Sequence, residues 1–212
     1  MCGVCGVIAR RGGEVEARAL AAMEHALAHR GPDDRGFLAW PGAGPVRAAK
    51  DPDVPPGARI ALGHRRLSII DLSEAGRQPM SSPDGTLHIV FNGEIYNYRE
   101  LRAELERDGR VFRSHSDTEV LLTALAAWGR TALPRLVGMF AFALLDTAAR
   151  TLFLARDVFG IKPLYFTRGP FGFAFASEIK GLLALPSVRR RADAGAVHDY
   201  LRYGDPDHGA RT

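Results

Sequence analysis

Short apolar runs separated by glycine, proline and polar residues recur along the chain. The first, residues 2–9, interleaves Val, Cys and Ile with glycine, a pattern typical of a short buried strand. Later runs of similar length are enriched in Val, Ile, Leu and Phe and predict further strands. The predicted strands are residues 2–9, 59–64, 87–91, 111–113, 137–145, 151–156 and 171–176.

Other stretches place apolar residues at helical spacing. In residues 14–29, Leu20, Met23 and Leu27 share one face, and Gly31-Pro32 ends the predicted helix. Ser116 or Asp117 is expected to cap a helix that has Glu119 in its first turn. The predicted helices are residues 14–29, 98–107, 117–128, 177–184 and 193–202, and the Pro- and Gly-rich stretch 41–57 is predicted to be a surface loop. Strands with helices between them indicate a mixed α/β or α+β domain.

The composition indicates a globular protein and sets expectations about its location and its partners. Its 212 residues are 46% hydrophobic and 25% charged, ordinary values for a globular protein. It has no apolar run of about 18 residues and no signal-peptide pattern at its start, so we expect a cytoplasmic protein without a membrane partner. The net charge of +4 comes mainly from scattered arginine, and the cluster at 189–191 is interpreted as a solvated face, not a nucleic-acid site.

The only two cysteines are Cys2 and Cys5, at C-x-x-C spacing. A redox pair normally lies at the N-terminus of a helix, whereas these residues fall in a predicted strand, where side chains three apart point to opposite faces. A structural zinc site needs about four ligands, and no second pair exists; His25 and His29 are interpreted as residues of the helix surface and end. Cys5 is therefore predicted to be a small buried hydrophobe. A redox or metal-binding thiol protein stays open as the alternative from another class.

Cys2 has a further chemical possibility because it directly follows Met1. Removal of Met1 would give Cys2 a free α-amine with a pKa of about 7.7–8.0, close to that of a free thiol. Such an amine can act, directly or through a water, as the base for its own side chain.

Several longer motifs occur in one order along the chain: RGPDD at 30–34, GHRRLSIIDLS at 63–73, FNGEIYNYRELR at 91–102, SDTEVLL at 116–122, GMFAFALLD at 138–146, ARDVFGIKPLYF at 155–166 and ASEIKGLL at 176–183. Together they make the chain resemble, over essentially its whole length, the N-terminal glutaminase domain of asparagine synthetase. That domain is a class II glutamine amidotransferase of the N-terminal-nucleophile hydrolase type. The resemblance implies an α+β fold, specifically a four-layer αββα sandwich, and L-glutamine as the substrate.

The resemblance also assigns roles to the reacting groups. Cys2 matches the nucleophile, which forms a thioester with glutamine and releases ammonia. Asn92 and Gly93 match the oxyanion hole, through the Asn side-chain amide and the Gly backbone N–H. Taken without the resemblance, Asn-Gly after an apolar strand predicts a hairpin turn, and such a turn would also expose the glycine N–H.

Other positions match the part of the family's pocket that holds the substrate. Arg66 matches the arginine that binds the α-carboxylate, since a guanidinium grips a carboxylate through two parallel bonds. Its neighbour Arg65 should point the opposite way along a strand. Ile70 lies in a pocket-lining segment, and Glu94 and Asp117 match acidic positions for the α-amino group. Asp117 could instead serve only as a helix cap.

The family's second domain bears on partners and cofactors. We expect residues 1–190 to form the amidotransferase domain, and residues 191–212 to begin a linker to a C-terminal synthetase domain that is not in this sequence. No cofactor or metal is expected in residues 1–190, whereas ATP and Mg²⁺ belong to the synthetase domain, for which aspartate is the expected ammonia acceptor. The GIKPLYF loop is expected to face a neighbouring domain, and a homodimer is compatible with the resemblance. The alternative within the family is the same domain serving another acceptor.

Overall fold

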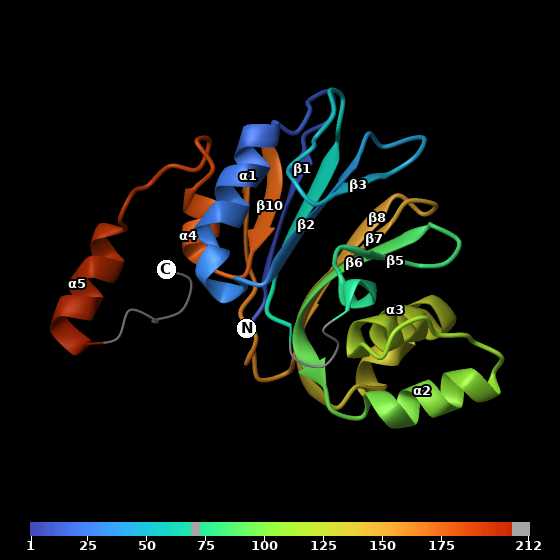
Figure 1. Cartoon of the computed structure of the whole chain (residues 1–212). Coiled ribbons are helices and arrows are strands. Elements are labelled where there is room, and N and C mark those ends of the chain that lie inside the picture. Colours follow the sequence, from blue (N-terminus) through green and yellow to red (C-terminus); the bar gives the residue numbers. More distant parts are fainter. Residues whose placement is uncertain (69–72, 205–212) are drawn as a thin grey trace.

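The computed structural model describes residues 1–68 and 73–204 of the chain. Two antiparallel sheets pack face to face, and helices cover the outer face of each (Figure 1). This is the four-layer αββα arrangement that the resemblance implied.

The six-stranded sheet has the order β3-β2-β4-β1-β10-β9, so the first strand of the chain lies inside it. Its strands are β1 (Gly3–Ala9), β2 (Asp34–Trp40), β3 (Arg47–Ala49), β4 (Ile60–Arg66), β9 (Tyr165–Gly169) and β10 (Gly172–Ala176). Its outer face is covered by α1 (Ala17–Ala26) and α4 (Ile179–Leu183). Leu20, Met23 and Leu27, the predicted apolar face of the first helix, are fully buried there.

The four-stranded sheet has the order β5-β6-β7-β8. Its strands are β5 (Met80–Ser81), β6 (Leu87–Ile95), β7 (Gly138–Asp146) and β8 (Thr151–Arg156). Its outer face carries α2 (Tyr98–Arg107) and α3 (Asp117–Trp128). Ser116 caps α3 by accepting a hydrogen bond from the Thr118 N–H, which decides between the two predicted caps.

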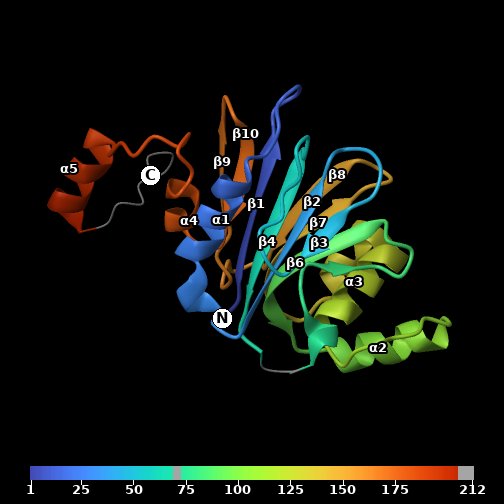
Figure 2. The ribbon, with the colours of Figure 1, turned by 45° about the horizontal axis from the view of Figure 1, so that its top comes forward.

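The core has three parts, one for each interface between layers. One lies between the four-stranded sheet and its helices, and a second lies between the six-stranded sheet and α1 with α4. The third, between the sheets, includes Val4, Leu62, Val90 and Phe175. In contrast, α5 (Ala194–Tyr203) has no buried residue and stands apart from the sheets in both views (Figure 2).

Several predicted elements were wrong in detail. Residues 111–113 form no strand, because Val111 is 81% exposed and Phe112 instead packs beside the core of α2 and α3. The loop predicted at 41–57 contains the short strand β3, and the predicted helix at 14–29 ends as α1 at Ala26, followed by a 3-10 turn.

The pattern also missed β2, β5 and β9. Gly36 interrupts the apolar run of β2 because the chain passes close to it: a Cβ at Gly36 would lie 2.1 Å from the carbonyl oxygen of Gln78. The strand β5 has only two residues, too few to show any periodicity. In β9, Tyr165 and Phe166 are exposed, so the strand lacks a buried apolar run.

Candidate active site

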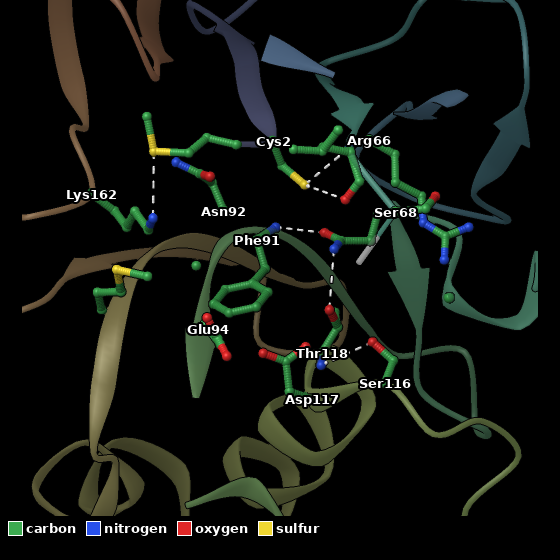
Figure 3. Close-up of a pocket in the computed structure, with 16 residues that line it drawn as sticks. Cys2, Arg66, Ser68, Phe91, Asn92, Glu94, Ser116, Asp117, Thr118 and Lys162 are labelled. Atoms are coloured by element: carbon green, nitrogen blue, oxygen red, sulfur yellow. Dashed lines mark hydrogen bonds between the residues drawn. The ribbon is translucent and has the colours of Figure 1, made fainter. Parts of the chain in front are cut away.

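A cavity of about 210 Å³ opens where the start of β1, the ends of β4 and β6 and the start of α3 meet (Figure 3). The side chains that β4 and β6 direct between the two sheets reach it, because alternate residues of a strand face the same side. The lining residues are Met1, Cys2, Arg66, Leu67, Ser68, Gly76, Gln78, Phe91, Asn92, Gly93, Glu94, Ser116, Asp117, Thr118, Met139 and Lys162. The cavity thus brings together Cys2, Arg66, Asn92, Gly93, Glu94 and Asp117, all predicted as site residues, whereas Ile70 lies outside the described residues.

Cys2 is partly exposed at the wall of this cavity. Its Sγ accepts a hydrogen bond from the Leu67 N–H at 3.4 Å and lies 3.7 Å from the Leu67 carbonyl oxygen. Burial raises the pKa of the Cys2 thiol, although the contact with Leu67, the chain N-terminus and Arg66 act in the opposite direction. The thiol therefore needs a base to become an effective nucleophile at neutral pH.

The two cysteines face different parts of the molecule. Cys5 is 1% exposed and packs with Leu20 and Met23 in the core between the six-stranded sheet and α1. Cys2 faces the space between the sheets, and both thiols are free. The strand alternation predicted from the sequence is confirmed, and it separates the two thiols chemically.

The same alternation separates Arg65 from Arg66. Arg65 forms an ion pair with the buried Glu24 of α1, on the helix-covered side of the sheet. Arg66 lines the cavity and is 7% exposed, and its guanidinium donates to the Ser73 carbonyl at 2.8 Å. A buried guanidinium at one wall suits an anionic group of a ligand.

Asn92 and Gly93 lie inside β6 and not in a turn, so the predicted hairpin was wrong. They pair with Ala141 and Phe140 of β7. A Cβ at Gly93 would lie 2.4 Å from the Met139 carbonyl oxygen, which explains the glycine by close approach of backbone instead of turn geometry. Asn92 is 1% exposed, and its Nδ2 has no hydrogen-bond partner among the described residues.

On the edge of β6 that faces away from β7, the Gly93 N–H lies between two N–H groups, those of Phe91 and Ile95, that have side-chain partners. The strand pairs with β5 only at His88 and Ile89, so beyond that point the edge has no neighbouring strand. The Phe91 N–H donates instead to Gln78 Oε1 at 2.6 Å, and the Ile95 N–H donates to Asp117 Oδ2 at 3.0 Å. Because backbone N–H groups alternate along a strand, the Gly93 N–H points out of this same edge. Gly93 lines the cavity between two residues whose N–H groups are already bonded to side chains, so its N–H is placed to donate to a ligand there.

Asp117 and Glu94 place two carboxylates at the wall formed by α3 and β6. Asp117 is 5% exposed. Burial raises its pKa to about 6; the N–H groups of Ile95 and Thr118 act against this, and the nearby charge of Glu94 adds to it. A cationic group bound here would relieve the cost of the buried charge.

The sequence did not single out the contacts of Arg30. Its Nε donates to the Cys2 carbonyl oxygen at 2.9 Å, and its guanidinium bonds Glu178 at 2.7 Å. Arg30 is only 8% exposed, so it holds the backbone of Cys2 against the start of α4. The RGPDD motif contains Arg30, but nothing in its spacing shows what the side chain reaches.

Lys162 and Gln78 are two more cavity residues that sequence reasoning missed. Lys162 is 6% exposed, and its Nζ lies 3.4 Å from the thioether sulfur of Met1 (Figure 3). Gln78 is 5% exposed and bonds two walls of the cavity. A group of three His, Cys, Asp or Glu residues able to hold a metal ion does not occur in the described ranges.

These groups can act together on an amino acid. A cation on one wall and two carboxylates on another, of which Asp117 is buried and Glu94 exposed, can hold a zwitterionic head group. Two N–H donors near a thiol can stabilise an oxyanion on the side chain. No helix within residues 1–68 and 73–204 is long and apolar enough to cross a membrane.

Comparison with known proteins gives a family match over nearly the whole chain. The family described as "Glutamine amidotransferase domain" matches residues 1–209. The Bacillus subtilis (strain 168) protein named asparagine synthetase (glutamine-hydrolyzing) 1 is 42% identical over 208 residues, 96% of this chain and 30% of that protein. Asparagine synthetase (glutamine-hydrolyzing) 3 of the same organism is 36% identical, over 96% of this chain and 31% of that protein. The chain therefore spans about a third of the length of these relatives.

A solved structure shows the same fold. The glutamine phosphoribosylpyrophosphate amidotransferase of B. subtilis, solved with ADP and GMP, superposes with a TM-score of 0.75 at 26% sequence identity. The match covers 90% of this chain and 45% of that one.

Proposed function

We propose that this chain, which belongs to the glutamine amidotransferase domain family, hydrolyses glutamine to glutamate and ammonia at the cavity of Cys2. The observation that carries this proposal is the pair of N–H donors that Asn92 and Gly93 of β6 present at the cavity. Asn92 Nδ2 is buried without a partner in the described structure, and the Gly93 N–H points from an edge whose neighbouring N–H groups are satisfied. Two fixed donors beside a thiol are what a tetrahedral oxyanion needs.

The charged walls set the orientation of glutamine in this proposal. Arg66 binds the α-carboxylate, and Asp117 with Glu94 binds the α-amino group. The side-chain amide then reaches toward Cys2, with its carbonyl oxygen between Asn92 and Gly93. Opposite charges at the head group select an amino acid over a simple amide.

The reaction proceeds in two halves. The α-amine of Cys2, freed when Met1 is removed, takes the thiol proton, and Sγ bonds to the amide carbon. The tetrahedral oxyanion collapses, the C–N bond breaks, and the proton passes to the departing nitrogen to give ammonia and a thioester. Water then adds to the thioester, and a second collapse releases glutamate and restores the thiol.

The amine is the base that the cavity supports. The lining residues in the described ranges include no histidine, and burial raises the pKa of the Cys2 thiol. The α-amine of Cys2 belongs to the same residue, so it needs no further side chain to position it.

The labelling reagent 6-diazo-5-oxo-norleucine, a glutamine-like electrophile, tests this function. We expect one adduct, at Cys2, in protein that lacks Met1, and we expect glutamine to slow the labelling. Cys2→Ala should abolish the adduct, whereas Cys5→Ser should keep it because Cys5 is buried on the other face of the sheet. Labelling at Cys5, or no labelling of the parent protein, would contradict the proposal.

For the ammonia acceptor we propose aspartate, activated with ATP and Mg²⁺ by a synthetase domain to which this domain is joined. The two relatives named asparagine synthetase support this assignment. The segment after β8 offers a surface for such a partner, since Val158 is 96% and Phe159 88% exposed. Lys162 of the same segment lines the cavity, so the surface lies close to the place where ammonia forms.

A different acceptor is the second candidate. The same fold occurs in a protein named for phosphoribosylpyrophosphate, so the glutaminase site by itself does not determine where ammonia goes. The natural protein supplied with glutamine, aspartate, ATP and Mg²⁺ separates the two cases. Asparagine as the product supports the first, and glutamate with free ammonia but no asparagine supports the second.

A further inference from the structure

Gln78 lies between two walls of the cavity, β6 and α3, which are also joined by the hydrogen bond from the Ile95 N–H to Asp117 Oδ2. The residue precedes β5, and its side chain is 5% exposed. Its backbone is held close to β2, because a Cβ at Gly36 would meet the Gln78 carbonyl oxygen at 2.1 Å. The position of Gln78 is therefore fixed by the six-stranded sheet.

The two ends of the Gln78 side-chain amide form hydrogen bonds with different elements. Oε1 accepts the Phe91 N–H of β6 at 2.6 Å, and Nε2 donates to Thr118 Oγ1 of α3 at 3.2 Å; Figure 3 draws both bonds as dashed lines. The orientation of the amide follows from the chemistry, since a backbone N–H can only donate. Phe91 directly precedes Asn92, and Thr118 directly follows Asp117.

The carbonyl of Phe91 is held as well. It accepts a hydrogen bond from Nε2 of His64, at 3.1 Å, and that ring is fully buried between the sheets. Burial lowers the pKa of His64 to about 4, so the ring is neutral and carries its proton on Nε2 toward the carbonyl. The side chains of Gln78 and His64 therefore bond the N–H and the C=O of Phe91 at the position where β5 no longer pairs with β6.

We propose that Gln78 is a positioning residue that fixes the oxyanion donors of Asn92 and Gly93 relative to the carboxylate of Asp117. This inference rests on the proposed function, in which these groups hold opposite ends of glutamine. The Gln78 amide joins the backbone of Phe91, beside one end, to the side chain of Thr118, beside the other. Its loss leaves every group that touches glutamine in place chemically. The Ile95 N–H to Asp117 Oδ2 bond still joins β6 to α3, but the separation of the two ends is held less firmly, and small misplacements of reacting groups cost up to about 100-fold in rate.

Gln78→Met tests the proposal in the full chain with Met1 removed. Methionine keeps the length and apolar volume of the side chain but makes neither hydrogen bond. We expect kcat/KM for glutamine to fall by about 10- to 100-fold. Glutamate γ-semialdehyde, whose aldehyde adds to Cys2 and places an oxygen at the oxyanion donors, should lose affinity by a similar factor. Alkylation of Cys2 by iodoacetamide, which forms no oxyanion, should stay within about twofold of the parent rate.

Thr118 supplies a matched pair of variants for the other end of the amide. Thr118→Val removes the acceptor of Gln78 Nε2 at nearly constant volume, and Thr118→Ser restores the hydroxyl. We expect Thr118→Ser to recover most of the kcat/KM that Thr118→Val loses. Combined with Gln78→Met, Thr118→Val should add little further loss, because both variants break the same link.

Ser82→Ala is the structural control. Ser82 is buried and accepts the Leu87 N–H at 3.0 Å, so this variant removes a hydrogen bond from the far end of β6. We expect it to lower stability without changing kcat/KM.

Three results would each contradict either the proposed function or the positioning role of Gln78, and the measurements distinguish them. If the parent protein does not hydrolyse glutamine, the proposed function fails, and this inference fails with it. If the parent is active and Gln78→Met keeps kcat/KM within about twofold, the positioning role alone is wrong. If glutamine hydrolysis and iodoacetamide alkylation fall together, Gln78 serves the fold and not the oxyanion.

Discussion

The Asp117 carboxylate occupies surroundings that oppose its charge. It is 5% exposed and lies near Glu94, and burial is the largest cause of its pKa rising to about 6. An acid whose pKa rises on folding destabilises the folded state where it is ionised. The residue thus lowers stability at neutral pH, and a bound ammonium would offset that cost.

Asp117→Asn is expected to separate these two effects. Asparagine can still accept the Ile95 N–H, so at pH 8 the free energy of unfolding should rise by on the order of 1–2 kcal/mol. The gain should shrink as pH falls from about 6 to about 3.8, because the folded parent then becomes protonated. The glutamine KM should rise by about 10- to 100-fold through loss of a charged partner. Urea unfolding at several pH values and steady-state kinetics measure both, and an unchanged KM would place Asp117 outside the substrate site.

Whether the sequence could predict the contacts of a side chain depended on what determines them. Strand alternation is visible in the sequence, whereas packing between distant elements is not. Arg65 and Arg66 follow strand alternation, so their opposite directions could be predicted. Arg30 and Gln78 could not, because their partners lie far along the chain: Glu178 for Arg30, and Thr118 for Gln78. No local pattern encodes a contact that closes only when separate elements pack.

Helix α4 begins at a cluster of charges that anchors the start of the chain. Glu178 bonds Arg30 at 2.7 Å, His29 at 3.0 Å and Lys180 at 3.1 Å, and Arg30 in turn bonds the Cys2 carbonyl. Burial acts to raise the pKa of Glu178, but the hydrogen bonds from these three residues outweigh it and lower the pKa to about 2. Residues at the start of this short helix thereby support the backbone of Cys2 from a distant part of the sequence.

Glu178→Gln should weaken this support. At pH 7 the free energy of unfolding should fall by about 1–2 kcal/mol, less than the pKa shift alone implies because the side chain is 25% exposed. The difference should disappear as pH falls from about 4.5 to about 2, since the folded-state advantage of the carboxylate is lost there. Glu16→Gln is the matched control, because Glu16 pairs with Arg18 at the exposed surface and should contribute little. Equal stability of Glu178→Gln and the parent at pH 7 would contradict the prediction.

At the scale of elements, long apolar runs predicted strands and helices well, whereas most edge strands were not predicted. The strands β1, β4, β6, β7, β8 and β10 correspond to predicted runs, whereas the edge strands β3, β5 and β9 were missed, as was the interior strand β2, whose apolar run Gly36 interrupts. Edge strands bury less apolar area, so their residues need not form a recognisable pattern. The hairpin predicted at Asn92 and Gly93 was wrong for a different reason, since close approach of the Met139 carbonyl oxygen, and not a turn, requires the glycine.

At the scale of the whole molecule, Met1 brings the start of the chain into contact with Lys162, a residue of its later part. Met1 lines the cavity, and its thioether contacts Lys162, so a retained methionine occupies space beside the thiol as well as blocking the amine. Filling the space beside the thiol and blocking the amine both occur at the cavity, which is lined there by residues from the beginning and from the later part of the chain.

A peptide tag fused before Met1, so that Met1 is retained, is expected to abolish glutamine hydrolysis. The same tag after residue 212 should leave hydrolysis intact. Intact-mass analysis of active protein should show a chain that begins at Cys2. Full activity in the tagged protein would exclude the Cys2 amine as the base.

Strand β1 lies between β4 and β10 in the six-stranded sheet, with Cys5 opposite Gly63 on one side and Ala176 on the other. During synthesis, the second of these neighbours emerges from the ribosome only after most of the chain has been made. The first strand therefore waits with one edge unpaired, and its leading end is open to the peptidase that removes Met1 throughout that interval. We therefore expect trimming of the terminus to precede the pairing of β10 with β1, so that the order of translation would separate exposure of the Cys2 amine from completion of the sheet.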